Sequence, residues 1–328
     1  MCKKKMVLVM ILILAIMLSG CGGNNSPEST TPASTTPDST TAKRTDINLT
    51  LPSEITSLDP YYTTAIADFQ LLRQMYEGLY FMENDTTLQP RLAESYELAD
   101  DGMTYTFKLR DAKFHNGDSV TADDVVFSLE RAKAAPAMAN RTMSIETVKA
   151  VDPKTVEVKT IDVMAAALNN IVEIEILSKK AVEAAGDKFG ISVVDCGTGP
   201  YHVVSFDPSS KIEFEAFEDY YRDAASIKKI TYRIMTDTSS AFIAFESGDL
   251  DMVPVPLSSW KVVEESGKYQ TGLGEETHVS YMPLNIAQPP FDNKKLRQAI
   301  AHAVDKESIV IAAYEGLANV ADFMMNPE

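Results

Sequence analysis

The amino-acid sequence predicts a mixed α/β fold of about two domains. Segments with the period of two that is typical of half-buried strands alternate with segments in which apolar residues recur every three or four positions, as on one face of a helix. Glycine, proline and asparagine turn signals separate several of these segments. The part expected to fold runs from Asp46 to Glu328, which is long enough for about two domains.

Strand-type patterns occur at several places along this part. The alternation is clear in residues 47–51 and 105–109, and valines at 156 and 158 mark another strand. Residues 201–205 and 212–217 are predicted to pair across the Asp207-Pro208 turn.

Helical patterns lie between and after these strands. Residues 67–80 carry apolar side chains on one predicted face, and residues 125–132 follow a predicted capping box at Thr121–Asp124. Residues 239–247 are predicted to form a helix that ends at Gly248, because glycine is favoured just after a helix. The helix predicted around residues 296–304 has one apolar face.

The N-terminus predicts a lipoprotein signal peptide over residues 1–20. Three lysines precede an apolar run from Met6 to Leu18, which is shorter than the roughly 20 residues needed to cross a bilayer. The sequence Leu18-Ser19-Gly20-Cys21 resembles a bacterial lipobox, so lipid attachment is predicted at Cys21; the alternative is an ordinary secretory signal. Residues 21–45, rich in Ser, Thr and Pro, are expected to form a tether. The protein is thus expected outside the cytoplasm, held at a membrane only by lipid.

Cysteines and charge narrow the possible partners. Cys196 is the one cysteine left after residues 1–21, so a buried, unreactive thiol is expected. Loss of three lysines with the signal peptide changes the formal charge from −17 to −20, from 27 basic and 47 acidic residues. No basic cluster interrupts this acidity, which argues against nucleic-acid binding.

Motifs for catalysis and cofactors are scarce, and neither an enzymatic activity nor a cofactor or metal is expected. Both Ser258-Ser259-Trp260-Lys261 and Ser226-Ile227-Lys228-Lys229 match S-x-x-K, but the S-D-N and K-T-G partners of serine acyl-enzymes do not occur. The four histidines are far apart in sequence: His115, His202, His278 and His302. A secreted acyl-enzyme using Ser258 and Lys261 remains the alternative from another functional class.

A loop after the first strand is the strongest local candidate for ligand binding. Tyr61, Tyr62 and Thr63 offer rings for stacking and hydroxyls for hydrogen bonds. The equally weighted alternative is that the tyrosines fill the core beneath a helix. Trp260 could stack on a ligand, although a packing role is favoured.

An ordered series of motifs resembles a known family. It includes Leu58-Asp59-Pro60, Tyr76-Glu77-Gly78-Leu79, Leu88-Gln89-Pro90-Arg91-Leu92-Ala93-Glu94-Ser95, the run from Asp100 to Arg110, Lys113-Phe114-His115-Asn116-Gly117, Thr121-Ala122-Asp123-Asp124, Gly197-Thr198-Gly199-Pro200-Tyr201, and Ala303-Val304-Asp305-Lys306. Together these are similar to the peptide- and nickel-binding class of extracytoplasmic solute-binding proteins, over nearly all of residues 46–328.

The resemblance implies a two-lobed fold of the periplasmic-binding-protein type II kind. Residues 46–76 and 197–277 would form lobe I, residues 77–196 an inserted small domain, and residues 278–328 the hinge and the start of lobe II. Family members are longer, so the resemblance also implies an incomplete second lobe, and the residues that grip ligand termini in peptide receptors would lie largely outside this sequence. Asn285 would lie near the hinge and contact ligand.

The implied function is that of a monomeric, substrate-binding lipoprotein that delivers di- or oligopeptides to an ABC permease. A nickel-chelate or small-sugar receptor of the same family is the alternative.

Overall fold

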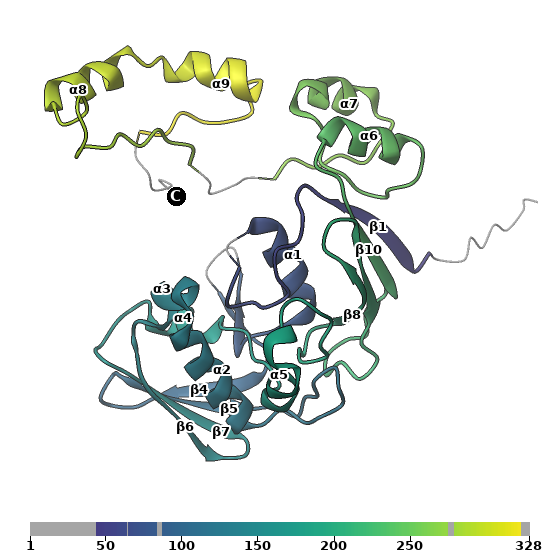
Figure 1. Ribbon diagram of the computed structural model, residues 1–328, viewed down its shortest axis with the longest axis vertical. Helices are drawn as coiled ribbons and strands as arrows, with labels where there is room; N and C mark the ends of the chain where they lie inside the picture. Colours follow the sequence, from purple (N-terminus) through teal and green to yellow (C-terminus); the bar gives the residue numbers. More distant parts are fainter. Residues whose placement is uncertain (1–43, 64, 84–86, 275–278, 323–328) are drawn as a thin grey trace, which may run out of the picture. The chain divides into compact units, whose positions relative to one another are not determined.

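The computed structural model describes residues 44–63, 65–83, 87–274 and 279–322. Within this part the strands form two four-stranded sheets and one two-stranded sheet, and helices follow or separate them (Figure 1). The mixed α/β prediction is therefore confirmed.

The first sheet joins the beginning of the described chain to a much later segment. Its order is β1-β10-β9-β8, with β1 at Asp46–Leu51, β8 at Tyr201–Asp207, β9 at Lys211–Ala216 and β10 at Lys229–Ile234. β1 lies parallel to β10, whereas the other pairs are antiparallel. Alternate side chains of β9, Ile212 and Phe214, are fully buried, as the period of two predicts. The predicted pairing of residues 201–205 with 212–217 is confirmed.

The second four-stranded sheet is wholly antiparallel. Its order is β4-β5-β7-β6, with β4 at Ala93–Leu98, β5 at Thr104–Leu109, β6 at Ile145–Asp152 and β7 at Thr155–Thr160. Helix α2, Ala122–Ala134, packs against β6 and β7 and begins at the predicted capping box of Thr121 and Asp124. All four strands of this sheet lie within residues 77–196, the range predicted to form an inserted domain. The bounds of that domain stay a prediction.

Helix α1 is shorter than the sequence predicts. It spans Ile66–Met75, whereas the apolar pattern predicted residues 67–80. Tyr76 is already extended, with φ −122° and ψ 148°, and its hydroxyl donates a hydrogen bond to the Leu58 carbonyl at 3.1 Å. The chain then enters β2, Tyr80–Met82, which pairs with β3, Leu88–Pro90. The prediction was wrong here because tertiary contacts overrode the helical period.

The remaining helices are short. They are α3 Ala139–Thr142, α4 Ala167–Val172, α5 Lys179–Ala185, α6 Thr238–Glu246, α7 Trp260–Ser266, α8 Lys294–Ala303 and α9 Lys306–Tyr314. The predicted helices near 239–247 and 296–304 are confirmed as α6 and α8. Across the described ranges, no helix is both long and apolar enough to span a bilayer.

The backbone at the end of α1 crosses close to the backbone that leads into β8. Gly199 donates its N–H to the Met75 carbonyl at 2.8 Å, and a Cβ at Gly197 would lie 2.1 Å from the same oxygen. Cys196 is fully buried beside this crossing, and burial raises the pKa of its thiol to about 12. The thiol therefore stays protonated at neutral pH, in line with the unreactive cysteine that the sequence predicts.

Candidate functional site

The loop between β1 and α1 contains three of the predicted ligand-binding residues. Tyr61 is fully buried and its hydroxyl donates a hydrogen bond to the Glu175 carbonyl. Thr63 is also buried, and its hydroxyl donates to the Asp68 carboxylate at 2.5 Å. Tyr62, in contrast, is 56% exposed. Tyr61 and Thr63 thus hold the loop in place, Tyr62 presents a ring to solvent, and ligand binding by the three stays a prediction.

The same loop is fastened to α2 by one arginine. Arg131 donates hydrogen bonds to both carboxylate oxygens of Asp59, a residue only 5% exposed. Its guanidinium carbon also lies 5.0–5.4 Å from the ring centroids of Tyr61, Tyr62 and Phe189. A bidentate pair with stacked rings uses the planar geometry that arginine has and lysine lacks. Arg131 therefore has a structural role.

A cleft of about 420 Å³ lies beside α1, β2 and the segments that follow α4 and β9. Aromatic rings line part of it: Phe69, Tyr76, Tyr80, Phe81 and Tyr220. Four guanidinium groups line it as well: Arg73, Arg91, Arg141 and Arg222. Three carboxylates complete the charged lining: Glu77, Glu173 and Glu175. The cleft is therefore locally positive in a chain whose formal charge is −17, and it has the mixture of rings and polar groups that small-molecule sites use.

Glu77 is held firmly inside the cleft. Its two carboxylate oxygens accept hydrogen bonds from the hydroxyls of Tyr220, at 2.8 Å, and Tyr221, at 2.7 Å. Arg91 Nε lies 3.6 Å from one of these oxygens. Burial raises the pKa of Glu77, while the two tyrosines and Arg91 oppose that rise. Glu77 therefore already has its partners and organises the cleft wall.

Phe81 provides a ring against which two of the arginines stack. The guanidinium carbon of Arg91 lies 5.0 Å from the ring centroid, and that of Arg73 lies 5.9 Å from it. On the other wall, Arg141 donates one hydrogen bond to the Glu173 carbonyl at 3.2 Å. Such contacts orient the guanidiniums without neutralising them.

Glu175 is the unusual carboxylate of the cleft. The residue is partly exposed, but its Oε2 is enclosed and finds no hydrogen-bond partner among the described residues. Burial raises the pKa of the carboxyl to about 7, although the charges of Arg141 and Arg73 oppose the rise. A perturbed carboxyl in a cleft is a common mark of a functional site.

The sequence could not identify this cleft. Its arginines lie far apart in the sequence and share no local motif, because α1, the link between β3 and β4, α3 and the segment after β9 each contribute one. Three segments that carry the family resemblance do contribute to the cleft: Tyr76-Glu77-Gly78, Arg91 of the Leu88–Ser95 motif, and Pro200 of the Gly197–Tyr201 motif. Nothing in their sequence patterns indicated that they line one cleft.

The other predicted residues lie elsewhere. Asn285 is exposed, Trp260 is half-buried as the first residue of α7, and neither lines the cleft. Ser258 and Lys261 are both exposed. Cys21, the predicted signal peptide and most of the tether lie outside the described residues, so lipid attachment stays a prediction.

Two histidines that are distant in sequence meet in the structure. The ring centroids of His115 and His202 are 5.8 Å apart, and His202 Nδ1 lies 3.6 Å from Asp195 Oδ1. Burial lowers the pKa of His115 to about 4, whereas the contact with Asp195 raises that of His202. His278 lies outside the described residues. Among those that are described, no group of three His, Cys, Asp or Glu is placed to hold a metal ion.

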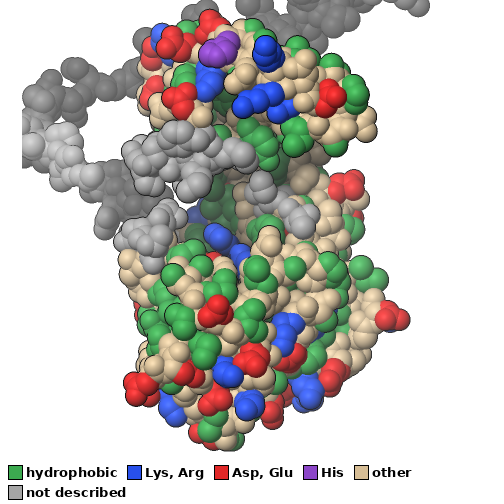
Figure 2. All heavy atoms as spheres, turned by 90° about the vertical axis from the view of Figure 1, so that its left-hand side faces the viewer, with side chains coloured by type: hydrophobic (Ala, Val, Ile, Leu, Met, Phe, Trp, Pro, Cys, Tyr) green, Lys and Arg blue, Asp and Glu red, His purple; other side chains and the backbone are tan. Residues whose placement is uncertain are grey.

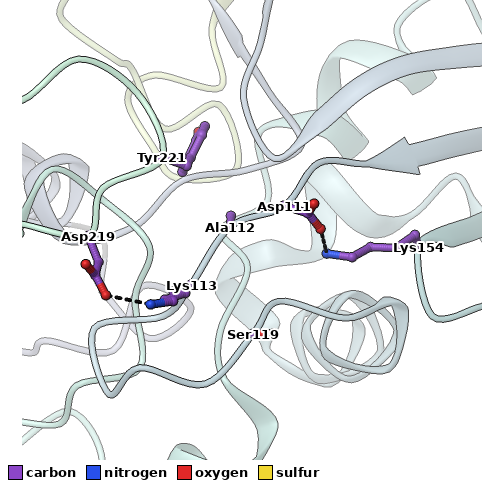
Figure 3. A pocket seen from close by; sticks show the side chains of 7 residues that line it. All are labelled: Asp111, Ala112, Lys113, Ser119, Lys154, Asp219 and Tyr221. Carbon is purple, nitrogen blue, oxygen red and sulfur yellow. Dashed lines mark hydrogen bonds and ion pairs between the residues drawn. The ribbon is translucent and has the colours of Figure 1, made fainter.

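A second hollow, of about 300 Å³, is less suited to a ligand (Figure 3). Lys154 pairs with Asp111 at 3.1 Å, and Lys113 pairs with Asp219 at 2.7 Å, as the dashed lines show. Each charged side chain that lines this hollow therefore already has an opposite charge beside it. On the face drawn in Figure 2, acidic and basic side chains are likewise intermingled.

Comparison with known proteins gives consistent matches. The model of the bacterial extracellular solute-binding proteins, family 5 (middle), matches residues 87–328. The glutathione-binding protein GsiB of Pectobacterium atrosepticum is 30% identical over 285 residues, 84% of this chain and 55% of GsiB.

Solved structures share the fold. NikZ from Campylobacter jejuni in complex with Ni(L-His) has a TM-score of 0.73 and 26% identity, over 85% of this chain and 57% of NikZ. MoaA from A. tumefaciens R10 in complex with mannopinic acid has a TM-score of 0.72 and 31% identity, over 83% of this chain and 57% of MoaA. The predicted type II fold is thus confirmed for the part compared, and the chain spans little more than half the length of these proteins.

Proposed function

Because the chain belongs to family 5 of the bacterial extracellular solute-binding proteins, we propose that it captures a di- or oligopeptide for an ABC importer. At the level of the family, these are extracytoplasmic proteins that bind a solute without transforming it. The secreted acyl-enzyme is therefore not proposed.

The cleft beside α1 is the observation that carries this proposal. It combines aromatic rings with oriented guanidiniums, and its volume of about 420 Å³ is within the range of small-molecule sites. Rings can stack on a peptide's planar groups, while guanidiniums can donate paired hydrogen bonds to its carboxylates. Tyr62 and Asn285 are kept as further proposed contacts, since both side chains are exposed.

A peptide is the preferred ligand because of GsiB, which is named for binding glutathione, a tripeptide. The metal-chelate alternative rests on NikZ, whose structure holds Ni(L-His). MoaA, which holds mannopinic acid, shows that ligands differ widely on this fold.

Delivery completes the proposal. The loaded protein would dock on a permease, and closure around the solute would be a hinge motion that ligand binding favours. Lipid on Cys21 would hold the protein at the membrane through the Ser/Thr/Pro tether. The chain spans little more than half the length of its relatives. Docking and closure are therefore proposed for the whole protein, whereas solute binding can be tested with this chain.

Thermal unfolding of the purified chain with candidate solutes tests the ligand class. A ligand at a hundred times its Kd stabilises the native state by about 2.7 kcal/mol, which raises the melting temperature by several degrees. We expect glutathione or trialanine to give this rise and nickel–histidine or mannopinic acid to give less. A larger rise with nickel–histidine would replace the peptide proposal with the metal-chelate alternative.

A further inference from the structure

Two histidines meet where the loop between β5 and α2 contacts the segment that leads into β8. His115 donates its backbone N–H to the Gly197 carbonyl at 2.8 Å, and its ring Nε2 lies 3.0 Å from the Gly199 carbonyl oxygen. The ring centroids of His115 and His202 are 5.8 Å apart. We propose that this pair makes the contact acid-sensitive, so that the second proton it takes up releases residues 197–199 from His115.

The contact with Gly199 determines which nitrogen of the neutral His115 ring carries the proton. A carbonyl oxygen can only accept a hydrogen bond, so Nε2 is the protonated nitrogen and donates to it. Nδ1 is then the nitrogen that takes up a further proton. Phe217 packs against the same ring, with the two centroids 5.0 Å apart. Because this neighbour is apolar, a charged His115 would be poorly solvated here.

The two rings favour different charges. Burial lowers the pKa of His115 to about 4, and the charge of His202 acts in the same direction, although the bond to Gly199 and the charge of Asp195 oppose them. Asp195 Oδ1 lies 3.6 Å from His202 Nδ1, and this contact raises the pKa of His202. The first proton therefore goes to His202, and the second is disfavoured on His115. The other charged groups on the adjoining backbone are Glu215, which lies opposite His202 on β9, and the ion pair of Lys113 with Asp219.

Acid should therefore favour an opened form of this contact. In that form His115 is solvated, and its pKa returns to the ordinary value of 6.5. Between pH 6.5 and about 4 the opened form binds a proton that the closed form does not, so the closed form loses stability as the pH falls through this range. One such proton changes the opening equilibrium by at most about tenfold per pH unit. The raised pKa of His202 works in the opposite direction, which makes the net change smaller.

The segment that would be released supports a wall of the cleft. Gly199 also donates its N–H to the Met75 carbonyl at 2.8 Å. Tyr76 and Pro200, which follow Met75 and Gly199 in the chain, both line the cleft. Loss of the His115 contacts would free the backbone that holds this wall in place. The inference thus goes beyond the proposed function, because it concerns how pH acts on the cleft when no solute is present.

Hydrogen exchange of the purified chain at pH 7 and pH 5 tests the inference. The protection of the His115 and Gly199 amides, corrected for the intrinsic exchange rate at each pH, should fall at least about tenfold in the unaltered chain. His115→Gln keeps a donor for the Gly199 carbonyl but cannot become charged, so it should lose no protection between the two pH values. His302→Gln, which changes an exposed histidine on α8, is the control and should behave as the unaltered chain does.

A titration of the histidine ring resonances in the unaltered chain does not depend on any variant's folding. We expect the His115 ring to be still mostly uncharged at pH 5. The inference is overturned if His115 becomes charged near pH 6.5, if the protection does not fall in acid, or if it falls as far in His115→Gln. None of these measurements needs a solute, so they are independent of whether a peptide binds.

Discussion

Replacing Gly197 by alanine is expected to lower the free energy of unfolding by about 3 kcal/mol. The new Cβ would lie 2.1 Å from the Met75 carbonyl oxygen and 2.9 Å from a ring carbon of Tyr76. A backbone oxygen cannot move aside as a flexible side chain can, so the crossing has to separate. That separation would also strain the hydrogen bond from Gly199 to Met75.

Urea unfolding of the variant beside a matched control measures this effect. Gly272→Ala adds the same methyl group where no atom lies within 4 Å, and it should change stability by no more than about 0.5 kcal/mol. Equal urea midpoints for Gly197→Ala and Gly272→Ala would show that Gly197 does not lie this close to the Met75 carbonyl.

Replacing Arg131 by methionine is expected to cost about 3 kcal/mol or more of stability. The change would remove both hydrogen bonds to Asp59, which is 5% exposed, and leave that carboxylate without its cation. Breaking a buried ion pair from one side costs about 3–5 kcal/mol. The loss of the guanidinium from between Tyr61, Tyr62 and Phe189 adds to this cost.

Lys133→Met provides the control on the same helix. Lys133 pairs with Glu130 at 3.2 Å near the surface, and such pairs contribute between about 0 and 1 kcal/mol. The double variant Arg131→Met with Asp59→Asn should cost less than the sum of the two single changes, because the residues interact directly. If the double variant lost as much free energy of unfolding as the two single variants together, the direct interaction between Arg131 and Asp59 would be contradicted.

Local patterns predicted much of the fold. The capping box of Thr121 and Asp124 specifies the start of α2, and alternating burial in β9 follows the period of two. The end of α1 was mispredicted because the apolar pattern continues past Met75, whereas the contacts of Tyr76 end the helix there. Local periodicity carries no information about such long-range contacts.

The candidate site was harder to predict for a related physical reason. The sequence drew attention to a compact cluster at Tyr61 and Tyr62, yet Tyr61 is fully buried and serves the core. The cleft instead combines side chains of residues 69–81 with residues much later in the chain, among them Arg141, Glu175 and Arg222. No spacing rule connects residues that only the folded chain brings together.

The most direct test of the account is whether a peptide binds saturably in the cleft beside α1. Isothermal titration of a tripeptide panel that includes glutathione, into the purified chain and its Arg73→Ala variant, measures this. We predict one-to-one binding of at least one peptide to the unaltered chain, and binding at least about tenfold weaker to the variant. Binding that is unchanged in Arg73→Ala, or no binding of any peptide to the unaltered chain, would contradict the account.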